Sequence, residues 1–274
     1  MGRGLSYVVY AGTHGKGFQM RVVVAGATGR IGSRTVARLR DHGVEAVPVS
    51  RHHGVDVLTG DGLSEALRGA EVLVDVTDAP ARTEGAGLHF FRTATTNLLA
   101  AAVAAGVEHH VVLSAVGADL LWSDYFRAKL LQEDMVRNSP VPHSVVRSTP
   151  FFESIEVMVE RNTFADEVRV APVLVRPVST EDVAVTVAHV AVGLPLFGLG
   201  EVAGPEVRRL DELASEVVTA REDGRVVVPD PRARYFGAEL RERTLLPGEG
   251  ARLGHMAFAE WLGRPVVPAN GRVS

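Results

Sequence analysis

Residues 21–32 read RVVVAGATGRIG, and this stretch decides the fold. The apolar, β-branched run 21–25 is typical of a strand buried on both faces of a sheet. The glycines that follow permit a tight turn, close approach of backbone to a pyrophosphate, and close packing of the next helix. The N-terminus of that helix offers unpaired N–H groups to phosphate. The stretch therefore predicts a dinucleotide-binding turn, with contacts from Gly26, Thr28, Gly29, Arg30, Ile31 and Gly32.

Strand and helix patterns alternate from this turn as far as Pro150. The predicted strands are 21–25, 44–49, 55–57, 71–76, 110–113 and 144–147. The predicted helices between them are 31–42, 63–67, 90–105 and 125–137. This alternation predicts an α/β fold of the Rossmann type, in which helices cover both faces of a doubly wound parallel sheet.

The pattern loosens after Pro150, and this change predicts the domain organisation. Residues 1–19 are expected to form a disordered lead, and residues 20–150 the dinucleotide-binding core. Residues 151–274 are expected to form mainly a small C-terminal substrate lobe over the strand ends, with some segments returning to the core. Within that half we expect two short strands in 168–178, a strand at 226–228, and helices at 181–192, 210–220 and 257–262.

Composition excludes several classes of protein. The chain of 274 residues has no cysteine, which excludes disulfides and thiolate chemistry. A net charge of -4 without basic clusters argues against a nucleic-acid partner. Without an apolar run long enough for a membrane span or a secretory signal, the expected location is cytoplasmic. The pairs His52-His53 and His109-His110 are not expected to bind metal, because adjacent strand residues point to opposite faces and no acid completes a set.

The residues after the second predicted strand bear on the choice of cofactor. An acid there would hold the ribose 2′-hydroxyl of NAD, but the sequence has Ser50 and Arg51 instead. Arg51 can pair with a 2′-phosphate, Ser50 can donate a hydrogen bond to it, and Arg30 can lie against the same group. These residues favour NADP(H), while the alternative that both arginines are ordinary surface residues stays open.

Three residues form a candidate set for carbonyl reduction. Ser114 closes a predicted strand, Tyr125 opens the next helix, and Lys129 follows on the same helix face. A phenol has a pKa near 10, and a neighbouring ammonium lowers it. Tyr125 could then give a proton to a carbonyl oxygen as hydride arrives, while Ser114 orients the substrate and Lys129 also holds the cofactor ribose. The alternative is that Tyr125 only packs and Lys129 only binds cofactor.

The sequence also resembles a known family over about residues 20–262. The segments VVVAGATGRIGS (22–33), YFRAK (125–129) and VSTEDV (178–183) resemble the atypical short-chain dehydrogenases, in particular the NmrA-like NAD(P)H-binding group. The resemblance implies a strand order of 3-2-1-4-5-6. It further implies that Asp56 contacts adenine, that Val76 and Thr77 line the ribose, and that Thr149, Pro150 and Phe151 lie on the nicotinamide. Asp56 could instead simply form a turn, and many members of the group lack the tyrosine.

These observations predict an NADPH-dependent reductase that acts on a carbonyl or quinone group of an apolar, for example aromatic, small molecule. Two alternatives stay open. One is a non-catalytic NADP(H)-binding redox sensor that reports to a protein partner. The other is a non-redox enzyme on the same fold, namely an isomerase, a dehydratase or an epoxide-opening enzyme. A homodimer is expected only by analogy with the fold.

Overall fold

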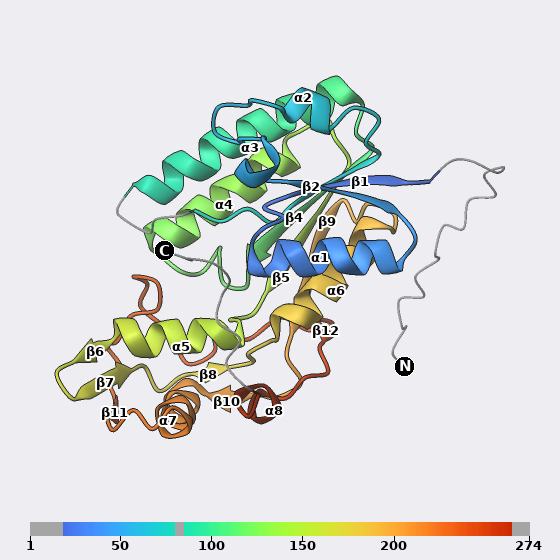
Figure 1. Cartoon of the computed structure of the whole chain (residues 1–274). Helices are drawn as coiled ribbons and strands as arrows, with labels where there is room; N and C mark the ends of the chain where they lie inside the picture. The colour runs from blue at the N-terminus through green and yellow to red at the C-terminus, as the bar shows by residue number, and fades with distance from the viewer. Residues whose placement is uncertain (1–18, 80–84, 265–274) are drawn as a thin grey trace.

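The computed structural model describes residues 19–79 and 85–264 (Figure 1). The predicted lead 1–19 thus lies outside the described residues, apart from Gln19. The central sheet has seven strands in the order β12-β9-β5-β4-β3-β1-β2, and every pairing in it is parallel. The prediction of a Rossmann-type parallel sheet is confirmed. The strands are β1 (Arg21–Ala25), β2 (Glu45–Val49), β3 (Val72–Asp75), β4 (His109–Ala115), β5 (His143–Ser148), β9 (Gly198–Ala203) and β12 (Arg252–Leu253).

Helices cover both faces of this sheet (Figure 1). One face carries α2 (Leu63–Ala66), α3 (Ala86–Ala105) and α4 (Asp124–Arg137), and the other carries α1 (Arg30–Asp41) and α6 (Thr180–Ala191). Successive side chains of β1 enter the two cores in turn: Val22 and Val24 pack towards α1 and α6, and Val23 packs towards α2 and α3. Both faces are buried, which is why β1 is apolar at every position from Val22 to Ala25 rather than at alternate positions.

The prediction of a strand at 55–57 is wrong. After a short 3-10 turn, η1 (Arg51–His53), these residues form a loop, and β2 is the edge of the sheet. The backbone N–H of Asp56 bonds to Asp61 O at 3.0 Å, and Asp56 Oδ1 accepts from Leu58 N at 2.8 Å. The polar groups of the segment are therefore used in a local turn, while Val55 supplies apolar packing below it. In the expected strand order 3-2-1-4-5-6, strand 3 is therefore absent, and β9 and β12 extend the sheet at the opposite edge.

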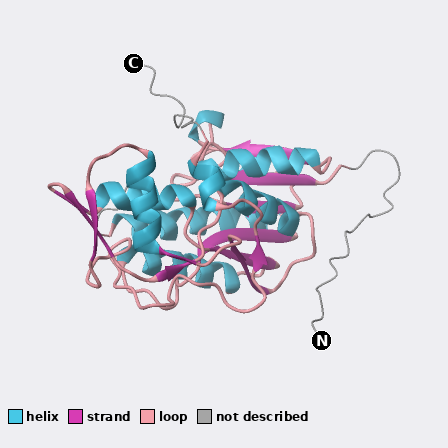
Figure 2. Cartoon of the chain, turned by 90° about the horizontal axis from the view of Figure 1, so that it is seen from below, coloured by secondary structure: helices cyan, strands magenta, loops and turns pink. Residues whose placement is uncertain are grey.

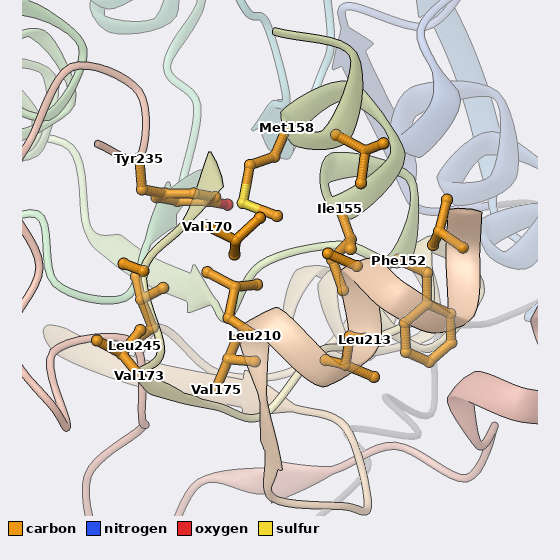
Figure 3. Packing of buried hydrophobic residues seen from close by; sticks show 14 of the residues in the cluster. Phe152, Ile155, Met158, Val170, Val173, Val175, Leu210, Leu213, Tyr235 and Leu245 are labelled. Carbon is orange, nitrogen blue, oxygen red and sulfur yellow. The ribbon is translucent and has the colours of Figure 1, made fainter. Parts of the chain in front are cut away.

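The C-terminal half contains a second, smaller body packed beside the sheet. Its helices are α5 (Phe152–Arg161), α7 (Leu210–Ala220) and α8 (Phe258–Leu262). Its short strands are β6 (Thr163–Phe164), β7 (Glu167–Val170), β8 (Leu174–Val175), β10 (Arg208–Arg209) and β11 (Val226–Pro229). The strands at the left end of Figure 2 belong to this lobe, and Figure 3 shows its core, in which α5 packs against Leu210 and Leu213. In contrast, α6, β9 and β12 pack with the central sheet.

Helix α5 was not predicted, although the sequence carries its signal. Phe152, Ile155 and Val159 recur at helical spacing and are buried, and Glu153 occupies the first turn. The sequence analysis assigned no element to residues 151–167, because strand and helix patterns no longer alternate after Pro150. Across the described part of the chain, no helix is long and apolar enough to cross a membrane.

Candidate functional site

A cavity of about 990 Å³ opens at the carboxyl ends of the central strands. The residues that follow β1, β2, β3, β4 and β5 all contribute to its wall. The chain runs outward from β1 to β2 on one side and to β3 on the other, so the cavity lies at the point where the strand order reverses. Open parallel sheets bind ligands at such a point.

The glycine turn forms one wall of the cavity, and its backbone leaves no room for side chains. Gly26 has φ +83°, and a Cβ there would lie 2.8 Å from Val76 O. A Cβ on Gly32 would lie 2.1 Å from Gly26 O, so the first turn of α1 sits directly against the glycine turn. Helix α1 has no side-chain cap and no acid in its first turn. Its N–H groups are thus left for an anion, as pyrophosphate binding requires.

The structure brings the predicted cofactor residues together around this cavity. All of them line its wall except Gly32, which lies beneath the turn. The lining residues are Gly26, Thr28, Gly29, Arg30, Ile31, Ser50, Arg51, Asp56, Val76, Thr77, Lys129, Pro150 and Phe151. They come from separate parts of the chain, which meet because parallel strands end at the same edge of the sheet.

The end of the cavity beside β2 has two arginines without acidic partners among the described residues. Neither Arg30 nor Arg51 forms an ion pair with any residue that the structure describes, and both line the wall. The Ser50 hydroxyl is hydrogen-bonded to His53 Nδ1 at 2.7 Å. Asp56 forms the turn described above and also lines the cavity, so the turn leaves room for the predicted adenine contact, which stays a prediction. The arginines make this end suited to a phosphate.

Asn97 has a structural role at the same end. Its side-chain amide donates to Val57 O at 3.0 Å and to Leu58 O at 2.9 Å. These bonds fasten the loop that carries Asp56 to α3. The residue acts on backbone carbonyls and does not line the cavity.

Lys129 is held inside the protein at the middle of the cavity wall. Its side chain is 4% exposed, and Nζ donates to Leu113 O at 2.7 Å and to Gln132 Oε1. The ammonium also lies over the Phe91 ring, 4.4 Å from its centroid. Burial lowers the pKa of Lys129, and the charges of Asp78, Asp75 and Glu133 act in the opposite direction. Two of its three N–H donors are used, which leaves one for a ligand.

Tyr125 lies one helical turn before Lys129, and both side chains line the cavity. The ring of Tyr125 packs against Phe126 at 5.1 Å and against Phe236 of the lobe at 5.2 Å between centroids. Residues 119–123, which precede α4 and include Leu120, Leu121 and Trp122, do not displace Tyr125 from the wall of the cavity. The lobe supplies the aromatic surface next to it.

Ser114 lines the cavity, but its hydroxyl oxygen is shielded from solvent. It lies beside Glu133, which is fully buried and bound by Arg147 through two 2.8 Å hydrogen bonds. Burial alone would raise the pKa of Glu133, but the hydrogen bonds and charge of Arg147, with a contribution from Arg137, outweigh it and hold that pKa below its usual value. The hydroxyl has no hydrogen-bond partner among the described residues, and its role in orienting substrate stays a prediction.

Two parts of the wall were missed from the sequence. One is the face of α5, with Glu153, Ser154, Val157 and Arg161, and the other is the tight turn at Tyr235 and Phe236. The helical period could have revealed α5. Nothing local marks the turn, because its place over the site depends on how the lobe packs. Among the described residues, no group of three or more metal-binding side chains occurs.

Comparison with known proteins agrees with this geometry. A family model described as NAD(P)H-binding matches residues 26–192. The chain belongs to this NAD(P)H-binding family. The match covers the glycine turn, Tyr125 and Lys129, and it extends through α6. The expectation of an NAD(P)H-binding family is thereby confirmed.

One curated relative is (4-alkanoyl-5-oxo-2,5-dihydrofuran-3-yl)methyl phosphate reductase from Streptomyces griseus, 31% identical over 147 residues. The match covers 48% of this chain and 49% of that protein, so the chain spans about half the length of the relative it matches.

Two solved structures show how widely the fold is shared. The NADPH-dependent quinone oxidoreductase of Escherichia coli has a TM-score of 0.59 at 17% identity, over 89% of this chain and 98% of that one. The UDP-N-acetylglucosamine 4-epimerase of Bacillus cereus has a TM-score of 0.64 at 16% identity, over 92% and 99%. At these identities the likeness establishes a common fold.

Proposed function

We propose that this member of the NAD(P)H-binding family is an NADPH-dependent reductase of a carbonyl or quinone group on an apolar, aromatic small molecule. The observation that carries the proposal is the placement of Tyr125 and Lys129 on one cavity wall with the glycine turn. The reductase activity of the Streptomyces griseus relative and the quinone oxidoreductase of similar fold support the reaction class.

The glycine turn and the N-terminus of α1 would hold the pyrophosphate, and Arg30 and Arg51 would hold a 2′-phosphate. Thr77, Pro150 and Phe151 would bound the ribose and nicotinamide, with the free N–H of Lys129 donated to the ribose. When bound, the dihydronicotinamide supplies hydride to the substrate carbon. The turn that forms this cradle requires glycine at both positions, because a Cβ on Gly26 would meet Val76 O and a Cβ on Gly32 would meet Gly26 O.

The Tyr125 hydroxyl would donate its proton to the substrate oxygen as that oxygen gains negative charge. The Lys129 ammonium, one helical turn away, favours the phenolate that is left. Because Lys129 is held by Leu113 O and Gln132, it would stay in place through the reaction without reorganisation.

The direct test follows NADPH absorbance with purified protein and a panel of aromatic ketones and quinones. The variant Tyr125→Phe should reduce ketone turnover roughly 100-fold or more, the usual size of a general-acid contribution, and leave the Kd for NADPH unchanged. Unaltered turnover would remove Tyr125 from the mechanism. Tight NADPH binding with no consumption would favour a redox sensor or a non-redox enzyme instead.

A further inference from the structure

Beyond Phe151, one of the residues expected to lie on the nicotinamide, the cavity is bounded by one face of α5. Glu153, Val157 and Arg161 are spaced four residues apart, so they share a helix face, and all three line the cavity. At 1.5 Å per residue, Glu153 and Arg161 are about 12 Å apart along the axis. This face therefore runs from Phe151 to the far end of the cavity.

Arg161 is a cation without a partner at that far end. In the described portion of the chain it meets no carboxylate and no hydrogen-bond acceptor, and its side chain is exposed. The residues one turn before it, Val157 and Met158, are apolar. Its neighbour Glu160 does not line the cavity. The guanidinium donors of Arg161 are thus available to a ligand.

Nearby charges do not compete for this position. Glu156 is paired with Arg221, and Arg234 is paired with Glu239. Glu153, the remaining charged residue on the α5 wall, accepts a hydrogen bond from Thr180 at 3.0 Å. Arg161 therefore determines the charge that this end of the cavity prefers.

An aromatic wall faces the same end. Tyr235 and Ala238 exchange backbone hydrogen bonds of 2.9 and 3.0 Å, which closes a two-residue turn with Phe236 at φ +47°. Aromatic residues rarely adopt this conformation, so the turn is held by its surroundings. Phe236 packs on Tyr235 at 4.4 Å between centroids and on Tyr125 at 5.2 Å.

The end of α5 anchors this turn. Asn162, which follows Arg161, donates from its side chain to Arg234 O at 3.3 Å. In Figure 3 the ring of Tyr235 lies beside Met158, three residues before Arg161. The aromatic rings and the free guanidinium thus bound one and the same part of the cavity.

We propose that the substrate is an elongated aromatic anion. Its carbonyl lies at Tyr125, its ring system lies along Tyr235 and Phe236, and its oxyanion group, a carboxylate or a phosphate ester, is bound by Arg161. The proposal rests on the proposed reductase function and adds the charge and length of the substrate to it. Arginine suits this role because its planar fork pairs with two oxygens at once.

The test compares three ketones: 4′-acetylbiphenyl-4-carboxylate, its methyl ester, and the shorter 4-acetylbenzoate. Binding to the complex with NADP⁺ is measured by calorimetry, and kcat/KM is measured with NADPH. The long acid should bind roughly 10-fold tighter than its ester, as expected for one charge-assisted contact. Arg161→Gln should abolish that difference and leave ester binding unchanged. The short acid should depend less on Arg161.

Arg40→Gln is the matched control, because it removes one exposed arginine of α1 that lies outside the cavity. It should leave all three affinities as they are. Phe236→Gly should weaken acid and ester alike, by about 3- to 10-fold for a lost aromatic contact.

Equal binding of acid and ester, or a preference that survives Arg161→Gln, overturns the anion site. In that case reduction of the ester would still support the reductase. Arg161-dependent binding of the acid without NADPH consumption by any of the ketones supports the anion site and contradicts the reductase.

Discussion

Gln132 donates a hydrogen bond from its side-chain amide to Asp75 Oδ2 at 2.8 Å, inside the protein. The oxygen of the same amide, Gln132 Oε1, accepts a hydrogen bond from Lys129 Nζ. Asp75 Oδ1 accepts two hydrogen bonds from Thr77, one from the backbone N–H at 3.0 Å and one from the hydroxyl at 2.7 Å. A continuous hydrogen-bonded chain thus links α4 to the end of β3. It fixes Lys129 relative to Thr77, and both residues line the cavity.

Replacing Gln132 by methionine should damage both stability and turnover. Asp75 would lose a buried partner, which costs about 1–3 kcal/mol, and Lys129 would lose an anchor worth about one order of magnitude in kcat. Urea unfolding and NADPH-dependent kinetics measure the two effects. Asp134→Asn, an exposed change on the same helix, serves as the control. Wild-type values for Gln132→Met would show that the chain does not position Lys129.

Arg51→Glu should reverse the cofactor preference. A carboxylate would repel the 2′-phosphate and could accept from a ribose hydroxyl, so the Kd for NADPH should rise roughly 10- to 100-fold while NADH binding holds or improves. Fluorescence titration with both cofactors checks this, with Arg40→Glu as a control for net charge. Tighter binding of NADH than NADPH by the unmodified protein would refute the NADP assignment.

The buried pair of Arg147 and Glu133 predicts a non-additive effect on stability. Arg147 also donates to Asp119 at 2.9 Å, so it ties the loop before Tyr125 to β5. Arg147→Met should cost about 3–5 kcal/mol, because it leaves the Glu133 charge buried with a single partner, Arg137. The double variant Arg147→Met, Glu133→Met should be more stable than the single variant in urea. An additive loss would contradict this account of the pair.

Two buried histidines on β4 predict a loss of stability in acid. Burial lowers the pKa of His109 to about 4, with a contribution from His110. Burial also lowers the pKa of His110 to about 4, against an opposing effect of Asp75. Unfolded histidine has a pKa near 6.5, so between pH 6.5 and 4 the unfolded chain binds protons that the folded chain does not.

The free energy of unfolding should therefore fall as the pH drops from 6.5 to 4, by on the order of 3 kcal/mol per histidine. Urea unfolding at several pH values measures the slope, and His110→Leu should reduce it. His52→Gln, at an exposed position, should leave the slope as it is. A flat profile in this range would contradict burial of the neutral histidines.

Local sequence predicted the dinucleotide half of the site well. The run 21–25, the glycine turn and the Tyr125–Lys129 spacing each act within a few residues, where sequence and structure are directly linked. The loop 55–57 shows where prediction from local sequence fails. A three-residue segment with two valines has the same pattern whether it forms a strand or a turn. Only the hydrogen bonds of Asp56 with Asp61 and Leu58 distinguish the two.

By itself the sequence determined the parallel α/β fold, the glycine turn and the residues that surround it. These features depend on the spacing of apolar residues and on the small size of glycine, both of which act between residues close together in the sequence. Only the tertiary structure decided that Ser114 is buried beside Glu133, that Gln132 links Lys129 to Asp75, and that Phe236 and Arg161 line the same cavity. Those relationships join residues up to 75 positions apart, and they depend on how the lobe and helices pack, which no local pattern records.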